Sequence, residues 1–170
     1  MKFQLIDRIE LLQPGERIVT VKTLSLAEEY LADHFPSFPI LPGVLMIEAM
    51  TQSAAWLVRL AQDYANSIVV LKTARNARYN YFLRPGNTLR CEVSVKTMDD
   101  DSAAFTASGS VGETPAVSAK LELMWRNVGG PGSEPAHADR RIVEQLKETF
   151  ALIGGPGALA AAEASQAAEA

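Results

Sequence analysis

A single carboxylate interrupts the most apolar stretch of this 170-residue chain. Between Phe35 and Val58 the only charged residue is Glu48, and His34 stands immediately before the stretch. An ionised carboxylate is seldom buried without a partner, and burial raises the pKa of a carboxyl group and favours its neutral form. A neutral carboxyl group that can donate a proton and a histidine that can accept one form a general acid/base pair. The sequence therefore points to proton transfer by His34 and Glu48.

The segment between these two residues predicts how a substrate could be polarised. Gly43 stands at the expected start of a helix, and three prolines keep the chain before it extended. These prolines are Pro36, Pro39 and Pro42. The first backbone N–H groups of a helix lack internal partners and lie at the positive end of its dipole. We expect the N–H of Gly43 to bind a carbonyl oxygen that gains negative charge. The spacing leaves open whether His34 and Glu48 meet within one chain or across a dimer.

The elements that must position these residues follow from the hydrophobic pattern. A helix is expected from about Gly43 to Leu60, and it is apolar almost all round, so most of its surface must be covered. Alternating patterns predict further elements: strands at 17–24 and 67–72, and a three-strand antiparallel meander over 88–96, 105–111 and 117–125. We expect an α+β fold in which an antiparallel sheet curls around one central hydrophobic helix. Such a sheet leaves an edge strand that commonly pairs with a second copy.

The chain is expected to contain one domain, residues 1–127, followed by an appended helix. Within the domain, a capping-box sequence at 25–28 predicts a short helix. Residues 128–139 are rich in glycine and proline and predict a linker. Residues 140–154 have the pattern of an amphipathic helix that ends at a glycine pair. The alanine-rich residues 155–170 are expected to form a frayed, low-complexity tail.

Composition argues against several other classes of protein. The chain is 48% hydrophobic and 21% charged, which is typical of a globular protein, and its net charge of −4 gives no sign of nucleic-acid binding. The single cysteine, Cys91, excludes an internal disulfide and fits a reducing, cytoplasmic compartment. Charges near the start oppose a signal peptide, and the prolines, Glu48 and Gln52 oppose a membrane span in the apolar stretch. We expect a cytoplasmic protein without a membrane span, a metal or a cofactor.

The segment HFPSFPILPGVLMIEAMTQ resembles the active-site signature of the 3-hydroxyacyl-acyl-carrier-protein dehydratases of the FabZ type, in the hotdog-fold superfamily. The matching residues are His34, Phe35, Pro36, Pro39, Pro42, Gly43, Val44, Leu45, Glu48, Ala49 and Gln52. A looser resemblance covers residues 3–126. It implies the hotdog fold, with two chains forming one continuous sheet in a homodimer or in a trimer of dimers.

The resemblance also implies a reaction in fatty acid biosynthesis, the loss of water from a 3-hydroxyacyl thioester to give a trans-2-enoyl thioester. His34 would abstract the α-proton, and the partner subunit's Glu48 would protonate the departing hydroxyl. The N–H of Gly43 would polarise the thioester carbonyl, with Gln52 and Val44 in supporting positions. The acyl chain would arrive on the phosphopantetheine arm of an acyl carrier protein.

Two stretches depart from the family pattern. Phe38 replaces the second histidine of the signature, and Asn80, Tyr81, Phe82 and Asn87 replace most of a basic, proline-containing segment. Basic residues without acidic neighbours between Tyr64 and Cys91 offer an alternative surface for an acidic carrier protein. The candidate docking residues are Lys72, Arg75, Arg78 and Arg84.

Two other functions remain open from the sequence. A hotdog thioesterase needs a carboxylate near the helix but does not need the spacing between His34 and Glu48. A non-catalytic acyl-binding or scaffold protein could keep the signature while the departures at 80–87 close the site. Without the signature, each of the two residues would more often have a structural role. A lone histidine is more often a loop or core residue than a catalyst, and a buried glutamate is more often paired with an arginine.

Overall fold

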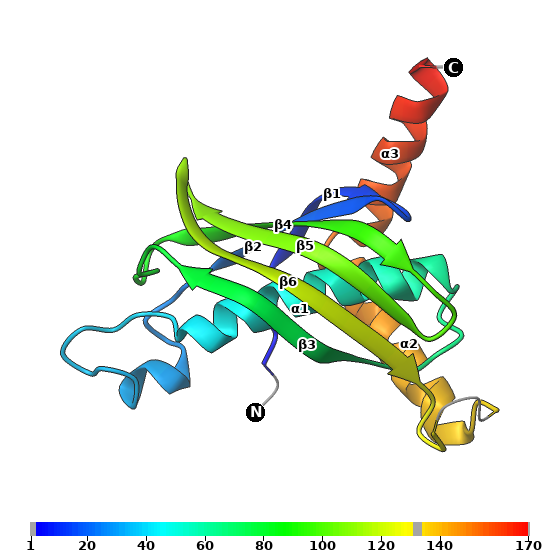
Figure 1. The fold of residues 1–170 in the computed structure, drawn as a ribbon, viewed down its shortest axis with the longest axis horizontal. Helices are drawn as coiled ribbons and strands as arrows, with labels where there is room; N and C mark the ends of the chain where they lie inside the picture. The colour runs from blue at the N-terminus through cyan, green and yellow to red at the C-terminus, as the bar shows by residue number, and fades with distance from the viewer. Residues whose placement is uncertain (1–2, 131–133, 170) are drawn as a thin grey trace.

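A curled six-stranded antiparallel sheet wraps around one long helix in the computed structural model, which describes residues 3–130 and 134–169 (Figure 1). The strands are β1 (Arg8–Gln13), β2 (Arg17–Thr23), β3 (Ile68–Tyr79), β4 (Thr88–Met98), β5 (Ser102–Val111) and β6 (Thr114–Arg126). Their order across the sheet is β1-β2-β4-β5-β6-β3. The predicted α+β fold is confirmed, and the predicted meander is the β4-β5-β6 part of the sheet.

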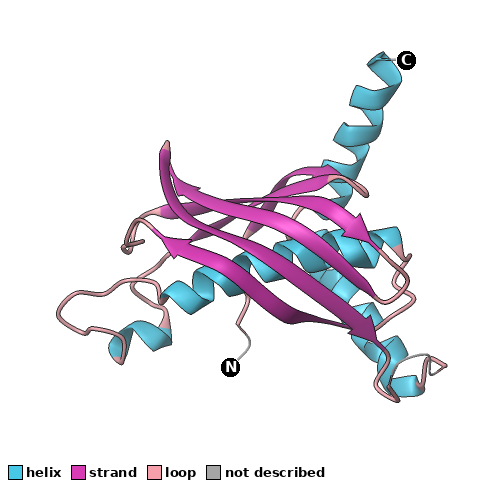
Figure 2. Ribbon diagram, viewed as in Figure 1, coloured by secondary structure: helices cyan, strands magenta, loops and turns pink. Residues whose placement is uncertain are grey.

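Helix α1 (Gly43–Ala61) lies against the concave face of the sheet (Figure 2). Its bounds agree with the predicted helix to within one residue at its end. Large side chains of both layers are fully buried where they meet, including Met50 and Leu57 from α1 and Leu89, Phe105 and Leu121 from the strands. This packing explains why α1 can be apolar almost all round, because little of its surface is left for water.

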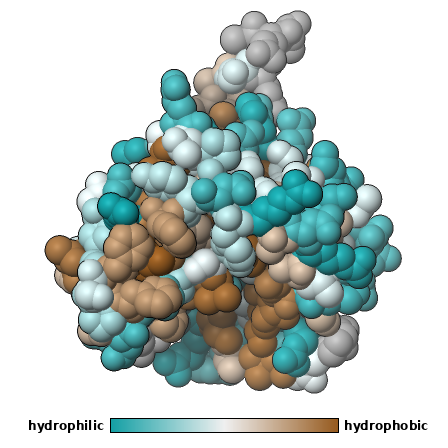
Figure 3. Space-filling model, turned by 60° about the vertical axis from the view of Figure 1, so that its left-hand side comes forward, coloured by the Kyte–Doolittle hydropathy of each residue, from teal (hydrophilic) through white to brown (hydrophobic). Residues whose placement is uncertain are grey.

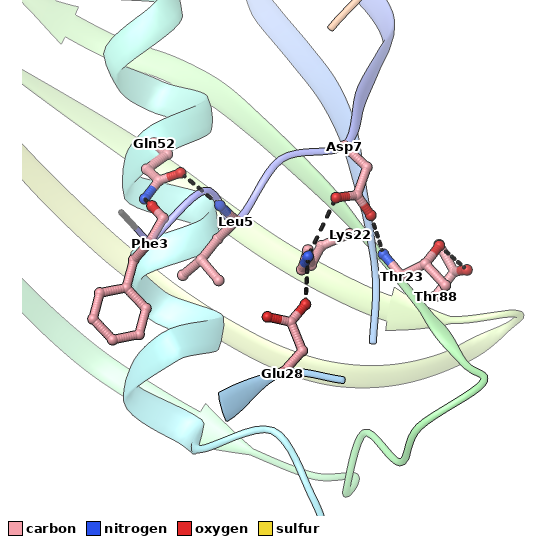
Figure 4. Close-up of polar contacts among 8 residues, drawn as sticks. All are labelled: Phe3, Leu5, Asp7, Lys22, Thr23, Glu28, Gln52 and Thr88. Carbon is pink, nitrogen blue, oxygen red and sulfur yellow. Dashed lines mark hydrogen bonds and ion pairs between the residues drawn. The ribbon is translucent and has the colours of Figure 1, made fainter. Parts of the chain in front are cut away.

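The capping box predicted at Ser25–Glu28 does not form. Ser25 Oγ accepts a hydrogen bond from the N–H of Ala27 (3.1 Å), and Glu28 makes an ion pair with Lys22 (2.8 Å) (Figure 4). Only a 3₁₀ turn, η1 (Glu29–Ala32), follows. Burial of Lys22 by itself would lower the pKa of its ammonium group, but Glu28 and Asp7 outweigh burial and raise it. The expected capping residue therefore serves as a counter-ion for a buried lysine.

The C-terminal region contains two helices, where one helix and a frayed tail were predicted. Helix α2 (His137–Leu152) begins inside the predicted linker, and α3 (Gly155–Glu169) occupies the predicted tail. The glycine pair does end α2, because Gly154 adopts a φ of +81° that favours glycine. Alanine has the highest helix propensity, which explains how an alanine-rich segment without an apolar stripe is helical. A helix thus occupies the residues for which a frayed tail was predicted.

Asp139 fixes the start of α2 to the sheet. Its buried carboxylate accepts hydrogen bonds from Ser67 Oγ and from the N–H groups of Val128 and Ala136, both at 2.8 Å. Ser67 precedes β3 and Val128 follows β6, so one side chain joins three segments. The hydrogen bond from Ser67 and those from the two backbone N–H groups lower the pKa of Asp139.

The two edges of the sheet differ in their cover. At the β1 edge, the N–H of Ile9 donates a hydrogen bond to the carbonyl of Ile153 (2.9 Å), and α3 packs beside the strand. At the other edge, none of the twelve residues of β3 is buried. A long, uncovered edge strand is suited to pairing with another chain. No helix among the described residues is long and apolar enough to cross a membrane.

Candidate active site

His34 lies in the turn between η1 and α1 with one ring nitrogen engaged. Its Nδ1 is 3.1 Å from the carbonyl oxygen of Ile40, and its backbone N–H donates to Tyr30 O (3.1 Å). A carbonyl can only accept a hydrogen bond, so Nδ1 carries the proton and the neutral ring has its lone pair at Nε2. The next residue, Phe35, has a φ of 55°, and its ring packs edge-on against the imidazole at 4.5 Å. This turn fixes the imidazole through Nδ1 and leaves Nε2 as the ring atom that can accept a proton.

Glu48 is held on one side by Gln52, one turn further along α1. The backbone determines the orientation of the Gln52 amide, because its Oε1 accepts from the N–H of Leu5 (3.0 Å) and its Nε2 donates to Phe3 O (2.9 Å) (Figure 4). Nε2 therefore also donates to Glu48 Oε1, at 3.0 Å. A proton on the neutral carboxyl group would reside on Oε2, because Oε1 already accepts a hydrogen bond. Gln52 has the orienting contact with Glu48 that the sequence implied.

A single chain neither buries Glu48 completely nor places it against His34. Glu48 is half-exposed and lines a groove of about 390 Å³ that His34 does not line. Among the described residues no hydrogen bond joins the two side chains. The expectation of a buried carboxyl group is wrong for the isolated chain, because α1 turns this part of its surface away from the sheet.

Gly43 is the first residue of α1, and the ring of Tyr79 lies directly over it. A Cβ atom at Gly43 would stand 2.9 Å from Cε1 of Tyr79, closer than such atoms approach. A side chain at position 43 would therefore displace the ring of Tyr79, which is half-exposed at the end of β3. The first N–H groups of α1 lack partners within the helix, as expected for an oxyanion site. Val44, the next residue, is 70% exposed at the same end of the helix.

The structure brings the two departures from the family pattern into contact. The rings of Phe38 and Phe82 meet edge to face with centroids 6.0 Å apart, and the Arg84 guanidinium lies 4.7 Å over Phe38. Apolar side chains are exposed on the segments that make this contact and on those next to them, and Figure 3 shows hydrophobic surface on the left and in the lower middle of the corresponding face. They are Phe35, Phe38, Val44, Tyr79, Tyr81 and Phe82. The aromatic replacements thus form one surface beside the His34 turn.

The four candidate docking residues do not form one group. Lys72 is paired with Glu122 at 2.7 Å, whereas Arg75 and Arg78 are exposed on β3. Arg84 is the member that contacts the aromatic surface. Arg84 is therefore better placed than Lys72 to meet a molecule that approaches His34.

Sequence reasoning missed Arg59, which lines the same groove as Glu48. The guanidinium lies 5.0 Å over the ring of Trp56, and burial lowers the pKa of Arg59 to about 10, so it remains charged at neutral pH. The signal was present in the spacing, because positions 48, 52, 56 and 59 share one face of a helix. Arg59 directly follows the apolar stretch that ends at Val58.

Comparison of the fold with solved structures places the chain among the hotdog-fold proteins. It is similar to the dehydratase heterocomplex ApeI:P from Xenorhabdus doucetiae, with a TM-score of 0.63 and 20% identity over 75% of this chain and 86% of that one. It is also similar to a mutant thioesterase, PA1618, from Pseudomonas aeruginosa, with a TM-score of 0.55 and 14% identity over 70% and 80% of the two chains. Both likenesses concern the fold alone.

Sequence comparison is more specific. A family model described as FabA-like domain matches residues 1–120. A 3-hydroxyacyl-[acyl-carrier-protein] dehydratase FabZ from Chloroflexus aggregans is 38% identical over 119 residues, which are 70% of this chain and 83% of the relative. The corresponding protein of Desulforamulus reducens is 37% identical over 70% and 84% of the two chains. The chain belongs to the FabA-like family, and α2 and α3 lie beyond the matched residues.

Proposed function

We propose that this protein is a hydro-lyase that dehydrates 3-hydroxyacyl thioesters carried by an acyl carrier protein. The observation that supports this most directly is the way its two catalytic candidates are held. His34 and Glu48 each have one polar atom fixed by a neighbour and one atom left for a substrate. The same reaction is supported by the relatives from Chloroflexus aggregans and Desulforamulus reducens, which are named as 3-hydroxyacyl-[acyl-carrier-protein] dehydratases.

The reaction follows from these free atoms. His34 Nε2 takes the proton from C2 of the acyl chain, and the electron pair moves onto the thioester oxygen, where the N–H of Gly43 stabilises the negative charge. When the carbonyl re-forms, the C2–C3 double bond forms and the C3–O bond breaks. The departing oxygen takes the proton of Glu48 Oε2 and leaves as water. The site then resets by moving a proton from His34 to Glu48.

The site is proposed to be shared between two copies of the chain. Glu48 is half-exposed and apart from His34, and β3 offers an uncovered edge for pairing. A dimer joined through β3 would set the His34 turn of one chain beside the partner subunit's Glu48 and would cover the carboxyl group. The carrier protein would approach over the aromatic surface and Arg84. A reducing, cytoplasmic location fits the single, buried Cys91.

The test is turnover of 3-hydroxybutyryl and 3-hydroxydecanoyl thioesters, on carrier protein and on coenzyme A, with enoyl absorbance and free thiol followed together. Glu48→Gln and His34→Ala should each lower the rate about 10²- to 10⁴-fold. Glu148→Gln, an exposed change of the same type on α2, should not alter it. Wild-type turnover by Glu48→Gln would remove Glu48 from the mechanism, and thiol release without enoyl formation would identify a thioesterase.

Mixing the two inactive variants tests where the pair meets. If each site takes His34 from one chain and Glu48 from the other, a mixed dimer contains one intact site. Unfolding and refolding an equal mixture should then restore about a quarter of wild-type activity, because half of the dimers are mixed and half of their sites are intact. If both residues act within one chain, the mixture stays inactive.

A further inference from the structure

The groove that contains Glu48 continues along α1 to Arg59. The two residues are eleven positions apart, or about three helical turns, so they stand on one face roughly 16 Å apart along the axis. Apolar and polar side chains line the groove between them, and the polar ones include Thr51, Gln52, Gln145 and Thr149. Ala55 and Trp56 come from α1, and Ile142 and Leu146 come from α2. The groove therefore has a carboxyl group at one end, a cation at the other and apolar side chains from both helices between them.

α2 forms one wall of this groove. It is fixed there by Phe150, a buried residue whose ring packs on Trp56 with centroids 5.3 Å apart. It is also fixed at its start by Asp139. α2 lies beyond the residues that the family model matches, so this wall is an addition to the part of the chain that carries His34 and Glu48.

Arg59 lacks the counter-ion that the buried lysine of this protein has. Lys22 pairs with both Asp7 and Glu28, whereas no described residue forms an ion pair with Arg59. The Nε atom of Arg59 is buried and has no hydrogen-bond partner among the described residues. Arg59 is half-buried, and leaving its buried Nε without a partner is costly, so a ligand that supplied an anion would be favoured.

We propose that Arg59 binds a carboxylate at the far end of the acyl chain, so that the protein prefers 3-hydroxyacyl thioesters that end in a carboxylate. This inference rests on the proposed dehydratase function. With the thioester end at Glu48, the methylene groups would lie against Trp56, Ile142 and Leu146. The terminal carboxylate would meet the guanidinium, whose planar fork suits it. A methyl-ended chain of the same length would leave Arg59 unpaired and would displace its water.

The experiment compares two 3-hydroxyacyl thioesters of equal chain length, one ending in a methyl group and one in a carboxylate. Several lengths are tested, because the reach to Arg59 should set an optimum. Wild-type protein should show a kcat/KM about ten- to a hundredfold higher for the carboxylate-ended substrate at that optimum, as expected for a charge-assisted hydrogen bond in a partly buried site. Arg59→Met should remove this preference and leave turnover of the methyl-ended substrate within about threefold. Arg59→Lys should retain part of it, and Arg141→Met, an exposed change on α2, should retain all of it.

The outcomes separate this inference from the proposed function. Dehydration of methyl-ended substrates with no preference for a carboxylate at any length would overturn the inference alone. A preference that survives Arg59→Met would overturn it as well. If Arg59 serves only to stack on Trp56, Arg59→Met would lower thermal stability and slow both substrates equally. Absence of dehydration with every substrate would instead refute the dehydratase function.

Discussion

Replacing Phe150 by alanine tests whether α2 is an integral part of the groove. The Phe150 ring is buried between Trp56 of α1 and the backbone of Gly155, where a Cβ atom would stand only 2.2 Å from the ring. Removing a buried phenylalanine typically costs about 3–5 kcal/mol, which includes the cavity it leaves. α2 lies at the surface and can partly relax into the space, so we expect the lower end, about 3 kcal/mol.

Thermal unfolding gives the readout. For a chain of this size, a loss of about 3 kcal/mol should lower the Tm by roughly 6–12 °C. The matched control is Leu152→Ala on the same helix, since Leu152 is 85% exposed and its removal should change stability by less than about 0.5 kcal/mol. All variants must be compared at one protein concentration, because dimerisation would make the Tm depend on it.

Equal unfolding temperatures for Phe150→Ala and Leu152→Ala would refute this packing. That result would mean that α2 does not pack on α1 in solution, and the groove would then lose its second wall. Turnover of a long-chain substrate should fall in Phe150→Ala more than turnover of a short-chain one, because only the long chain reaches the α2 wall. If turnover of both substrates falls equally, the substitution lowers activity through a general loss of stability and not through the groove.

Two further predictions concern contacts at the ends of α1 and α2. Gly43→Ala should cost no more than about 1 kcal/mol in urea unfolding, because the new methyl group displaces the half-exposed ring of Tyr79. Tyr79→Ala should relieve most of that cost in the double variant, and no relief would show that the contact is not the cause. Asp139 has a lowered pKa in the folded protein, so its charge stabilises the fold above the ordinary aspartate pKa, and this contribution is lost as the pH falls through the lowered value. The difference in Tm between wild type and Asp139→Asn should therefore be constant above about pH 5 and shrink in more acidic buffer; a gap independent of pH would contradict this.

The parts of the fold that the sequence predicted well are those in which local pattern and burial agree. α1 begins at Gly43 as expected, because prolines exclude an earlier start and an unbroken apolar run demands burial on all sides. The meander was equally readable, since each strand alternates and each turn carries glycine or acidic residues. β3 was predicted only to Lys72, although it continues to Tyr79, because its second half is an uncovered edge without an alternating pattern.

The wrong predictions arose where a distant residue decided the local structure. Glu28 would cap a helix in isolation, but Lys22, buried in a neighbouring strand, takes it as a counter-ion. The site shows the same limit. The signature predicted that His34, Glu48 and Gln52 act together. The contact between Gln52 and Glu48 is present, because residues four positions apart lie side by side on one face of a helix. No spacing rule gives the distance between His34 and Glu48, since a turn and a proposed second chain intervene.

The exposure of Glu48 links assembly to chemistry. A carboxyl group keeps its proton near neutral pH only in surroundings that disfavour its charge, and the isolated chain leaves Glu48 half-exposed beside a groove. α2 closes one side of that groove, and Gln52 fixes one oxygen. The remaining cover must come from the substrate or from a second chain, for which β3 is the uncovered edge. Dimerisation would then have two effects at once. It would bring a base to the acid, and it would create the dry surroundings in which the acid can act.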